Sequence, residues 1–110
     1  MRRGEVRWYT FSAPDKRRPV LILTRDSAIS YLNALTVAPI TSPVRDIPSE
    51  VLLTREDGLE INCAANMDNL QTVPKDKLGS LVATLSGGRM AEVNQAVAFA
   101  LGLDSPASWE

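Results

Sequence analysis

The chain has 110 residues, of which 45% are hydrophobic and 23% are charged, values typical of a single soluble domain. It has no histidine and one cysteine, Cys63, which excludes an internal disulfide, a thiolate zinc site and any nucleophile that needs a histidine base. No stretch approaches the roughly 18 apolar residues of a membrane-spanning helix, and no signal peptide is visible. Together with the single cysteine, which fits a reducing compartment, this predicts a cytoplasmic protein.

The first half of the chain predicts a series of short strands. Residues 4–11 alternate in polarity and predict a first strand, which a polar loop over residues 12–17 follows. Residues 18–24 are apolar on both faces, which favours a central strand. We expect a short helix that starts with Asp26 as its N-cap and ends near Leu32.

The next segments alternate between strands and turns. Residues 35–42 predict a third strand, in which Pro39 indicates an edge position or a bulge. A loop over residues 42–49 and a fourth strand over residues 50–54 follow, and a turn at residues 56–58 ends that strand.

The last segments predict two further strands and a helix. We expect a fifth strand at residues 61–70, a turn at residues 72–77 in which Pro74 takes a first helical position, and a last strand at residues 81–85. Ser86 is the expected N-cap of the C-terminal helix, and Gly102 its end. Apolar residues three to four positions apart give that helix a core-facing stripe: Met90, Val93, Val97 and Leu101.

Together these segments predict a mainly β protein with a C-terminal α-helix, folded as a small, strongly curved β-barrel. We expect one domain, residues 1–103, and a tail, residues 104–110. Residues 1–25 hold seven Lys and Arg against two acidic residues, a balance of +5, whereas the rest holds five against eleven, a balance of −6. This asymmetry suggests a face that binds an anion, and a solvated charge run is the alternative.

Two predicted strand ends carry the side chains best suited to chemistry. The basic residues 16–18 run into an apolar strand at Pro19, and a proline keeps the residue before it extended, so Arg18 should be held at the strand mouth. The strand that ends in Thr41 and Ser42 runs the other way. We therefore expect these two strand ends to meet and form a site.

An arginine and a hydroxyl favour chemistry on a phosphate. Arg18 can bind a phosphate through two hydrogen bonds and stabilise developing negative charge, and Thr41 can hold a phosphoryl oxygen. This pair lacks a strong base, which suits a substrate with its own nucleophile, such as the 2′-hydroxyl of RNA. From spacing alone, the simpler alternative is that Arg18 makes a salt bridge at the strand end and Thr41 is a turn residue.

Several blocks of the sequence resemble the MazF/PemK toxin family, over about residues 2–103 and in the family's order. These blocks are residues 3–8, 17–23, 37–42, 66–73 and 90–103. The resemblance implies an SH3-like small β-barrel of the MazF/PemK/CcdB kind. It also implies a homodimer, an acidic cognate antitoxin as a partner, and no metal or other cofactor.

The implied activity is that of an endoribonuclease acting without the ribosome on single-stranded RNA at short sequences. By similarity, Arg18 would stabilise the transition state or act as an acid, and Thr41 would help hold the phosphate. The implied products carry a 2′,3′-cyclic phosphate and a 5′-hydroxyl. Residues that we expect to contact RNA lie around this pair: Lys16, Arg17, Ser42, Asn66, Asp68, Asn69 and Gln71.

The chain also departs from the family. Asn66 stands where some members carry an arginine, and there is no histidine of the kind some relatives use. Asp68 matches and is either a base, an orienting carboxylate or a turn residue bonded to its own backbone. We expect Trp8 in the core rather than stacked on a base, and Cys63 as a small buried hydrophobe.

Two other functions stay open from the sequence. One is a gyrase-binding toxin of the CcdB type on the same barrel, which would not require Arg18 and Thr41. The other is a non-catalytic binding module, whose basic loop would dock an acidic peptide.

Overall fold

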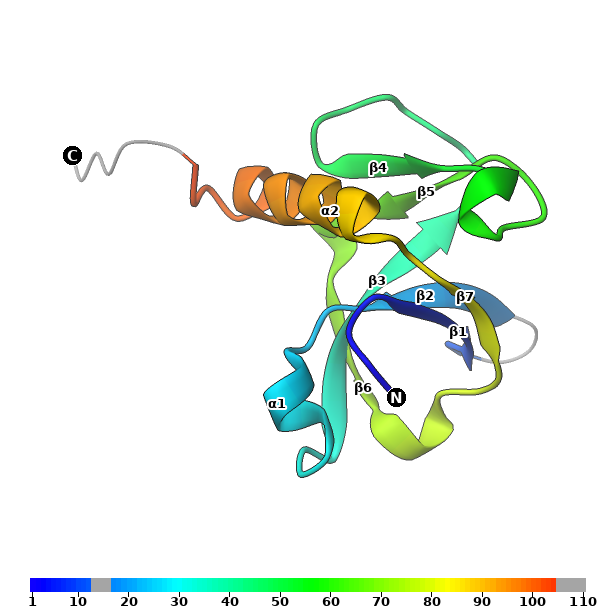
Figure 1. The fold of residues 1–110 in the computed structure, drawn as a ribbon, viewed down its shortest axis with the longest axis vertical. Helices are drawn as coiled ribbons and strands as arrows, with labels where there is room; N and C mark the ends of the chain where they lie inside the picture. Colours follow the sequence, from blue (N-terminus) through cyan, green and yellow to red (C-terminus); the bar gives the residue numbers. More distant parts are fainter. Residues whose placement is uncertain (13–16, 105–110) are drawn as a thin grey trace.

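Seven strands form one curved sheet in the computed structural model, which describes residues 1–12 and 17–104 (Figure 1). The strands are β1 (Glu5–Thr10), β2 (Arg17–Ile22), β3 (Ala34–Thr41), β4 (Glu50–Leu53), β5 (Cys63–Asn66), β6 (Gln71–Pro74) and β7 (Leu81–Thr84). The helices are α1 (Asp26–Ile29) and α2 (Gly87–Ala100), with short 3₁₀ helices η1 (Arg55–Asp57), η2 (Met67–Asn69) and η3 (Lys75–Lys77). The architecture is the predicted one, mainly β with a C-terminal α-helix.

Strand β3 is the centre of this sheet. The strand order is β4-β5-β3-β2-β1-β7, and β6 pairs with the first half of β3. All the pairs are antiparallel. Because β3 is long enough to hold β6 along its first half and β5 at its end, it joins both halves of the sheet.

The central strands bury both of their faces. Leu21 of β2 belongs to a core cluster that includes Val93 of α2, whereas its neighbours Val20 and Ile22 belong to a second cluster with Leu35 of β3. Successive side chains of a strand point to opposite faces, so two cores need a strand that is apolar on both sides. This confirms the prediction of a central second strand. Because buried residues hold β2 from both faces, the position of its first residues is fixed as well.

Pro39 does not mark an edge, one of the two positions that we predicted, and its pairing with β2 keeps a regular register with no bulge. The residue is buried within β3, between Val37, the last residue paired with β6, and Ile40, the first paired with β5. A proline has no backbone N–H to donate to a neighbouring strand. At this point β3 changes its partner from β6 to β5, so no such hydrogen bond is needed.

Three further predictions are corrected. The expected strand over residues 61–70 is only β5 followed by η2, and the expected turn over residues 72–77 contains strand β6. Asp26 is not the N-cap of α1: Arg25 holds that position, and the Asp26 carboxylate accepts a hydrogen bond of 2.7 Å from the backbone N–H of Arg3.

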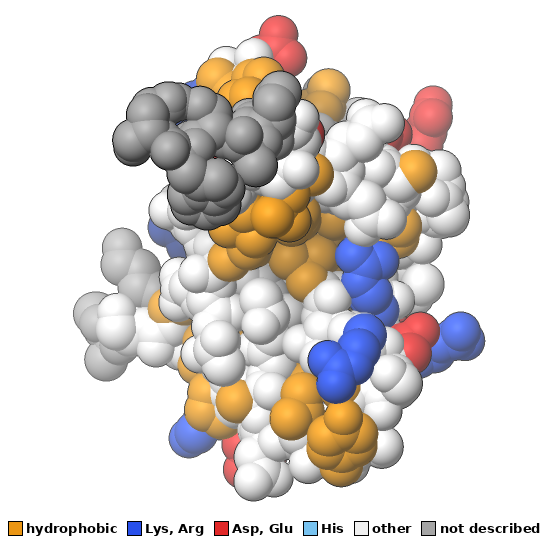
Figure 2. Space-filling model, turned by 90° about the vertical axis from the view of Figure 1, so that its left-hand side faces the viewer, with side chains coloured by type: hydrophobic (Ala, Val, Ile, Leu, Met, Phe, Trp, Pro, Cys, Tyr) orange, Lys and Arg blue, Asp and Glu red, His pale blue; other side chains and the backbone are white. Residues whose placement is uncertain are grey.

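Helix α2 closes one end of the sheet and packs against β4 and η2 (Figure 1). Ser86 caps it as predicted, accepting a hydrogen bond of 3.2 Å from the Arg89 N–H. Leu101 was expected in the core stripe but is 58% exposed. Figure 2 shows apolar side chains on the face of the molecule that lies at the left in Figure 1. No described helix is long and apolar enough to cross a membrane.

Candidate functional site

Arg18 and Thr41 lie across from each other at the ends of β2 and β3. The register of this pair runs from Ile22 opposite Val37 to Val20 opposite Pro39. Two residues further along, the same register places Arg18 opposite Thr41. Paired residues on one face of antiparallel strands have adjacent side chains. The two strand ends therefore meet, as the sequence predicted.

Two cavities meet at this pair of residues. A cavity of about 570 Å³ and another of about 460 Å³ share two lining residues among those that the structure describes, Arg18 and Thr41. The larger one lies over the side chains of Pro19 and Ile40, and the smaller one lies beside Pro39. Since neighbouring strand residues point to opposite faces, the cavities open on opposite faces of the β2–β3 pair. A chain that crosses the strand ends can reach both.

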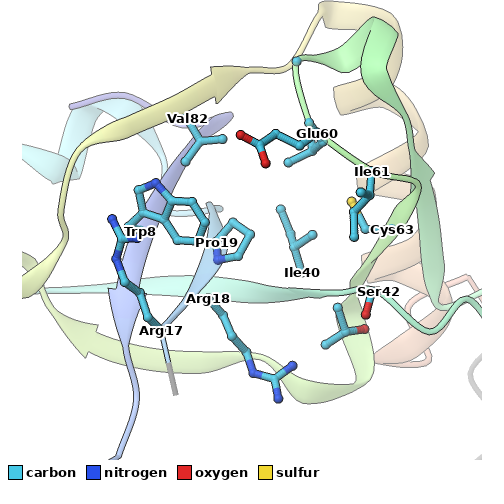
Figure 3. Close-up of a pocket in the computed structure, with 13 residues that line it drawn as sticks. Trp8, Arg17, Arg18, Pro19, Ile40, Ser42, Glu60, Ile61, Cys63 and Val82 are labelled. Carbon is cyan, nitrogen blue, oxygen red and sulfur yellow. The ribbon is translucent and has the colours of Figure 1, made fainter. Parts of the chain in front are cut away.

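The Arg18 guanidinium is exposed and extends away from Pro19 (Figure 3). Among the described residues, no carboxylate forms an ion pair with it. The salt bridge that would make Arg18 a structural residue is thus absent from that part of the chain. Thr41 is half-buried at the same edge, and its backbone belongs to β3.

Arg17 stacks on Trp8 in the wall of the larger cavity. Its guanidinium carbon lies 4.1 Å from the centroid of the Trp8 ring, which is a cation–π contact (Figure 3). Trp8 is half-buried and lines the cavity, so it is not the core residue that we expected. The stack holds an aromatic surface and a positive charge together beside Arg18.

The smaller cavity collects most of the predicted amides and the acidic residue. Its lining includes Asp68, Asn69 and Gln71, all of them exposed. The Ser49 hydroxyl donates a hydrogen bond of 2.5 Å to Asp68 Oδ2, which orients the carboxylate. Asp68 therefore lines the same cavity as Arg18, and its carboxylate is oriented by the Ser49 side chain rather than by its own backbone.

The structure does not bring Asn66 to either cavity, in contrast to our prediction. Its side chain is buried, at 2% exposure, and its Oδ1 accepts a hydrogen bond of 2.8 Å from the Asp68 N–H. This caps η2, a use that competes with base recognition for a short polar side chain. Ser42 lines the larger cavity, and Lys16 lies outside the described residues.

The loop before β5 forms a wall of the larger cavity that sequence analysis missed. It contributes Gly58, Leu59, Glu60 and Ile61. Gly58 has a φ of 95°, and a Cβ there would lie 2.9 Å from the Cβ of Ala83 on β7. Only glycine fits this close approach without strain. The contact joins residues that are far apart in the sequence, so no local sequence pattern predicts it.

An ion pair anchors the start of this loop to α2. Burial alone would raise the pKa of Asp57, but the hydrogen bond from Arg89 at 2.9 Å and that from the Thr54 N–H outweigh it and lower the pKa. Arg89 also contacts Glu92 at 3.0 Å.

Cys63 is the small buried hydrophobe that the sequence predicted. It is 4% exposed, and burial followed by the nearby charge of Asp57 raises the pKa of its thiol. Within the described ranges, no three His, Cys, Asp or Glu side chains are grouped closely enough to hold a metal ion.

Comparison with known proteins decides the family. A family model, described as the PemK-like, MazF-like toxin of type II toxin–antitoxin systems, matches residues 2–101. The chain belongs to this family. The resemblance seen in the sequence blocks is confirmed.

Individual MazF proteins match over most of their length. Endoribonuclease MazF3 of Mycobacterium tuberculosis is 39% identical over 90 residues, covering 82% of this chain and 87% of the relative. The M. tuberculosis toxin MazF-mt6 superposes with a TM-score of 0.83 at 35% identity, covering 91% and 98% of the two chains. A mycobacterial endoribonuclease in complex with its cognate antitoxin gives a TM-score of 0.86 at 28% identity, covering 96% and 99%. The fold is that of MazF toxins.

Proposed function

We propose that this MazF-family toxin is an endoribonuclease that cleaves single-stranded RNA at a short sequence around Arg18 and Thr41. The observation that carries the proposal is the position of this pair, facing each other at the edge that two cavities share. Relatives named as endoribonucleases support the class of reaction. A gyrase-binding toxin would need neither side chain.

The reaction is an attack of the ribose 2′-oxygen on the adjacent phosphorus. A bond forms between the 2′-oxygen and phosphorus, the bond from phosphorus to the 5′-oxygen breaks, and the products are a 2′,3′-cyclic phosphate and a 5′-hydroxyl. One proton leaves the 2′-hydroxyl and one is taken up by the 5′-oxygen. RNA supplies the nucleophile, so the protein needs mainly to position the phosphate and stabilise charge.

Arg18 supplies that stabilisation. The guanidinium is exposed at the strand mouth, and it has two parallel donors for the phosphate oxygens, whose negative charge grows in the transition state. The Thr41 hydroxyl, on the facing strand, holds a further phosphate oxygen. Both side chains are positioned by strands whose buried residues form the two cores.

Asp68 is the carboxylate best placed to receive the 2′-hydroxyl proton. It lines the smaller cavity with Arg18 and Thr41, and Ser49 orients it by a hydrogen bond of 2.5 Å. Asn69 and Gln71 in the same cavity have amide groups that can read base edges.

The test is cleavage of a long single-stranded RNA by the purified protein in excess EDTA, with new 5′ ends mapped by sequencing. We expect cuts at a repeated short motif and 5′-hydroxyl products, strongly reduced in Arg18→Ala and less reduced in Thr41→Val. Circular dichroism establishes that both variants are folded. A folded wild-type protein that leaves RNA intact, or equal cleavage by all three proteins, refutes the proposal.

We further propose a cytoplasmic homodimer that a cognate acidic antitoxin neutralises. Exposed apolar side chains at the end of α2 offer a surface for a second copy: Phe99, Leu101 and Leu103. Arg17 and Arg18 offer charges to an acidic antitoxin segment. Sedimentation of the purified protein tests the dimer. Loss of RNA cleavage on addition of the product of a small acidic reading frame immediately upstream tests the antitoxin.

A further inference from the structure

Among the described residues that line the larger cavity, Glu60 is the acidic one, and the basic ones are arginines. Glu60 comes from the loop between η1 and β5, and Arg17 and Arg18 come from β2. Its carboxylate points into the space that Trp8 and Ile40 also face (Figure 3). In the part of the chain that the structure describes, no basic group pairs with it. An exposed, unpaired carboxylate in such a cavity is available to a ligand.

The rest of the cavity suits a planar, partly apolar group. Its volume of about 570 Å³ lies in the range of small-molecule sites. Ile40, Cys63 and Val82 give it an apolar lining, and Trp8 gives it an aromatic surface. Single-stranded nucleic acid is bound by such a combination, in which a base packs on an aromatic ring and its phosphate meets a cation.

The loop that carries Glu60 is held in place from both sides. The Thr54 hydroxyl accepts a hydrogen bond from the Glu56 N–H, and the Asp57 carboxylate accepts one from the Thr54 N–H at 2.9 Å. Gly58 then packs against Ala83 of β7. The backbone two residues beyond such a fixed turn has a restricted range of positions, which places the start of the Glu60 side chain at the cavity wall.

The cavity is adjacent to the position proposed for the cleaved phosphate. Arg18 and Thr41 line both cavities, so the two nucleotides on either side of a phosphate held there can direct their bases into different cavities. We propose, on the basis of the proposed function, that the larger cavity binds one of these bases and that Glu60 makes it select bases with an amino group over uracil.

The chemistry of the base edges gives the direction of this selection. A carboxylate only accepts hydrogen bonds. Cytosine and adenine each present an amino donor, and guanine presents a ring N–H beside its amino group, whereas the single N–H of uracil lies between two carbonyl oxygens that a carboxylate repels. Cytosine and uracil have the same size, so the comparison of these two isolates the effect of the edge.

The matched variants are Glu60→Gln and Glu56→Gln. A glutamine at position 60 keeps the size and gains an N–H that can pair with a uracil carbonyl, so the preference should fall. Glu56 is exposed, lies four residues earlier in the same loop region and does not line the cavity. Its substitution changes the net charge equally and should leave the preference unchanged.

Two readouts separate this proposal from the proposed function. In the first, RNA oligonucleotides of the mapped motif carry cytosine or uracil on each side of the cut, and kcat/KM is measured for each. In the second, binding of single-stranded deoxycytidine and deoxyuridine hexamers, which have no 2′-hydroxyl and cannot be cleaved, is measured by fluorescence anisotropy. We expect the wild type and Glu56→Gln to prefer cytosine about ten-fold, and Glu60→Gln to lose that preference.

The outcomes are distinguishable. If folded wild-type protein cleaves no RNA, the proposed function fails, and the hexamer binding still decides the base preference. Suppose that RNA is cleaved, but that the preference for cytosine over uracil, in kcat/KM and in hexamer binding, is the same in Glu60→Gln and the wild type. The role of Glu60 is then refuted. A preference for uracil in the wild type refutes it as well.

Discussion

Arg18 and Arg89 carry the same guanidinium group but lie in opposite surroundings. Arg89 on α2 donates to Asp57 at 2.9 Å and to Glu92 at 3.0 Å, and 27% of its side chain is exposed. The hydrogen bond to Asp57 raises the pKa of Arg89, whose guanidinium is charged at any working pH in either case. Its hydrogen-bonding capacity is used within the fold.

Arg18 lies at a strand mouth, exposed, with no ion-pair partner among the described residues. Its backbone is held by β2, but its guanidinium is left for a ligand. An arginine that is paired with carboxylates stabilises the contact between two elements of the fold. An arginine on a rigid strand without such a carboxylate is available to bind an anion. The two residues should therefore respond to substitution in opposite ways.

The largest expected effect is on RNA cleavage by Arg18→Ala. Removing one preorganised group that stabilises the transition state should lower kcat/KM by about 10²- to 10³-fold. The free energy of unfolding should change by less than about 0.5 kcal/mol, because the side chain is exposed. Arg18→Lys keeps the charge but not the paired donors, so its kcat/KM should lie between those of the wild type and Arg18→Ala. An Arg18→Ala variant as active as the wild type would remove Arg18 from the site.

For Arg89→Ala we expect the reverse, a loss of stability with little change in RNA cleavage. Asp57 has a side chain only 9% exposed, and the variant leaves its carboxylate without its charged partner. The free energy of unfolding in urea should fall by about 1–3 kcal/mol, while cleavage by the folded protein stays near the wild-type rate. Glu92→Ala removes the exposed partner instead and should cost less than about 1 kcal/mol. Equal losses in the two variants would argue against the buried ion pair as the cause.

The site at the strand ends was predictable because its determinants are local. An apolar run on both faces marks β2 as central, and a proline after Arg18 extends the chain at its mouth. A hydroxyl at the end of the next apolar strand, Thr41, then follows from antiparallel pairing. Each of these signals lies within a few residues of the side chain that it positions and needs no knowledge of the rest of the fold.

What sequence analysis missed depends on distant contacts. Strand β6 has four residues, only Val73 of which is buried, and it is stabilised by pairing with β3. The wall that carries Glu60 is set by the approach of Gly58 to Ala83, which are 25 positions apart. Asn66 was expected to contact RNA, but its side chain is buried and accepts a hydrogen bond from the nearby Asp68 N–H.

The ion pair that distinguishes Arg89 predicts a pH dependence for Asp57→Asn. The pKa of Asp57 is lowered in the folded protein, so the unfolded chain takes up a proton first as the pH falls. The stabilisation is therefore complete above about pH 5, falls as the pH drops through the unfolded pKa of about 3.9, and is lost below the folded pKa. At pH 7 the wild type should be more stable than Asp57→Asn by about 1.5 kcal/mol. Urea unfolding at pH 7 and pH 3 should show that difference shrinking, and a constant difference would contradict the charge-based origin.

The smallest effect is expected for the hydroxyl that faces Arg18. Thr41→Val keeps the shape of the side chain and removes one hydrogen bond to the phosphate, which should lower kcat/KM by about two- to ten-fold. Thr41→Ser keeps the hydroxyl and should stay closer to the wild type. Because β3 is central and Thr41 is half-buried, the unfolding free energy of both variants must be measured alongside. If Thr41→Ser lowers the rate and Thr41→Val does not, the methyl group rather than the hydroxyl matters. Thr41 would then support Arg18 by packing, and Arg18 alone would hold the phosphate at the strand ends.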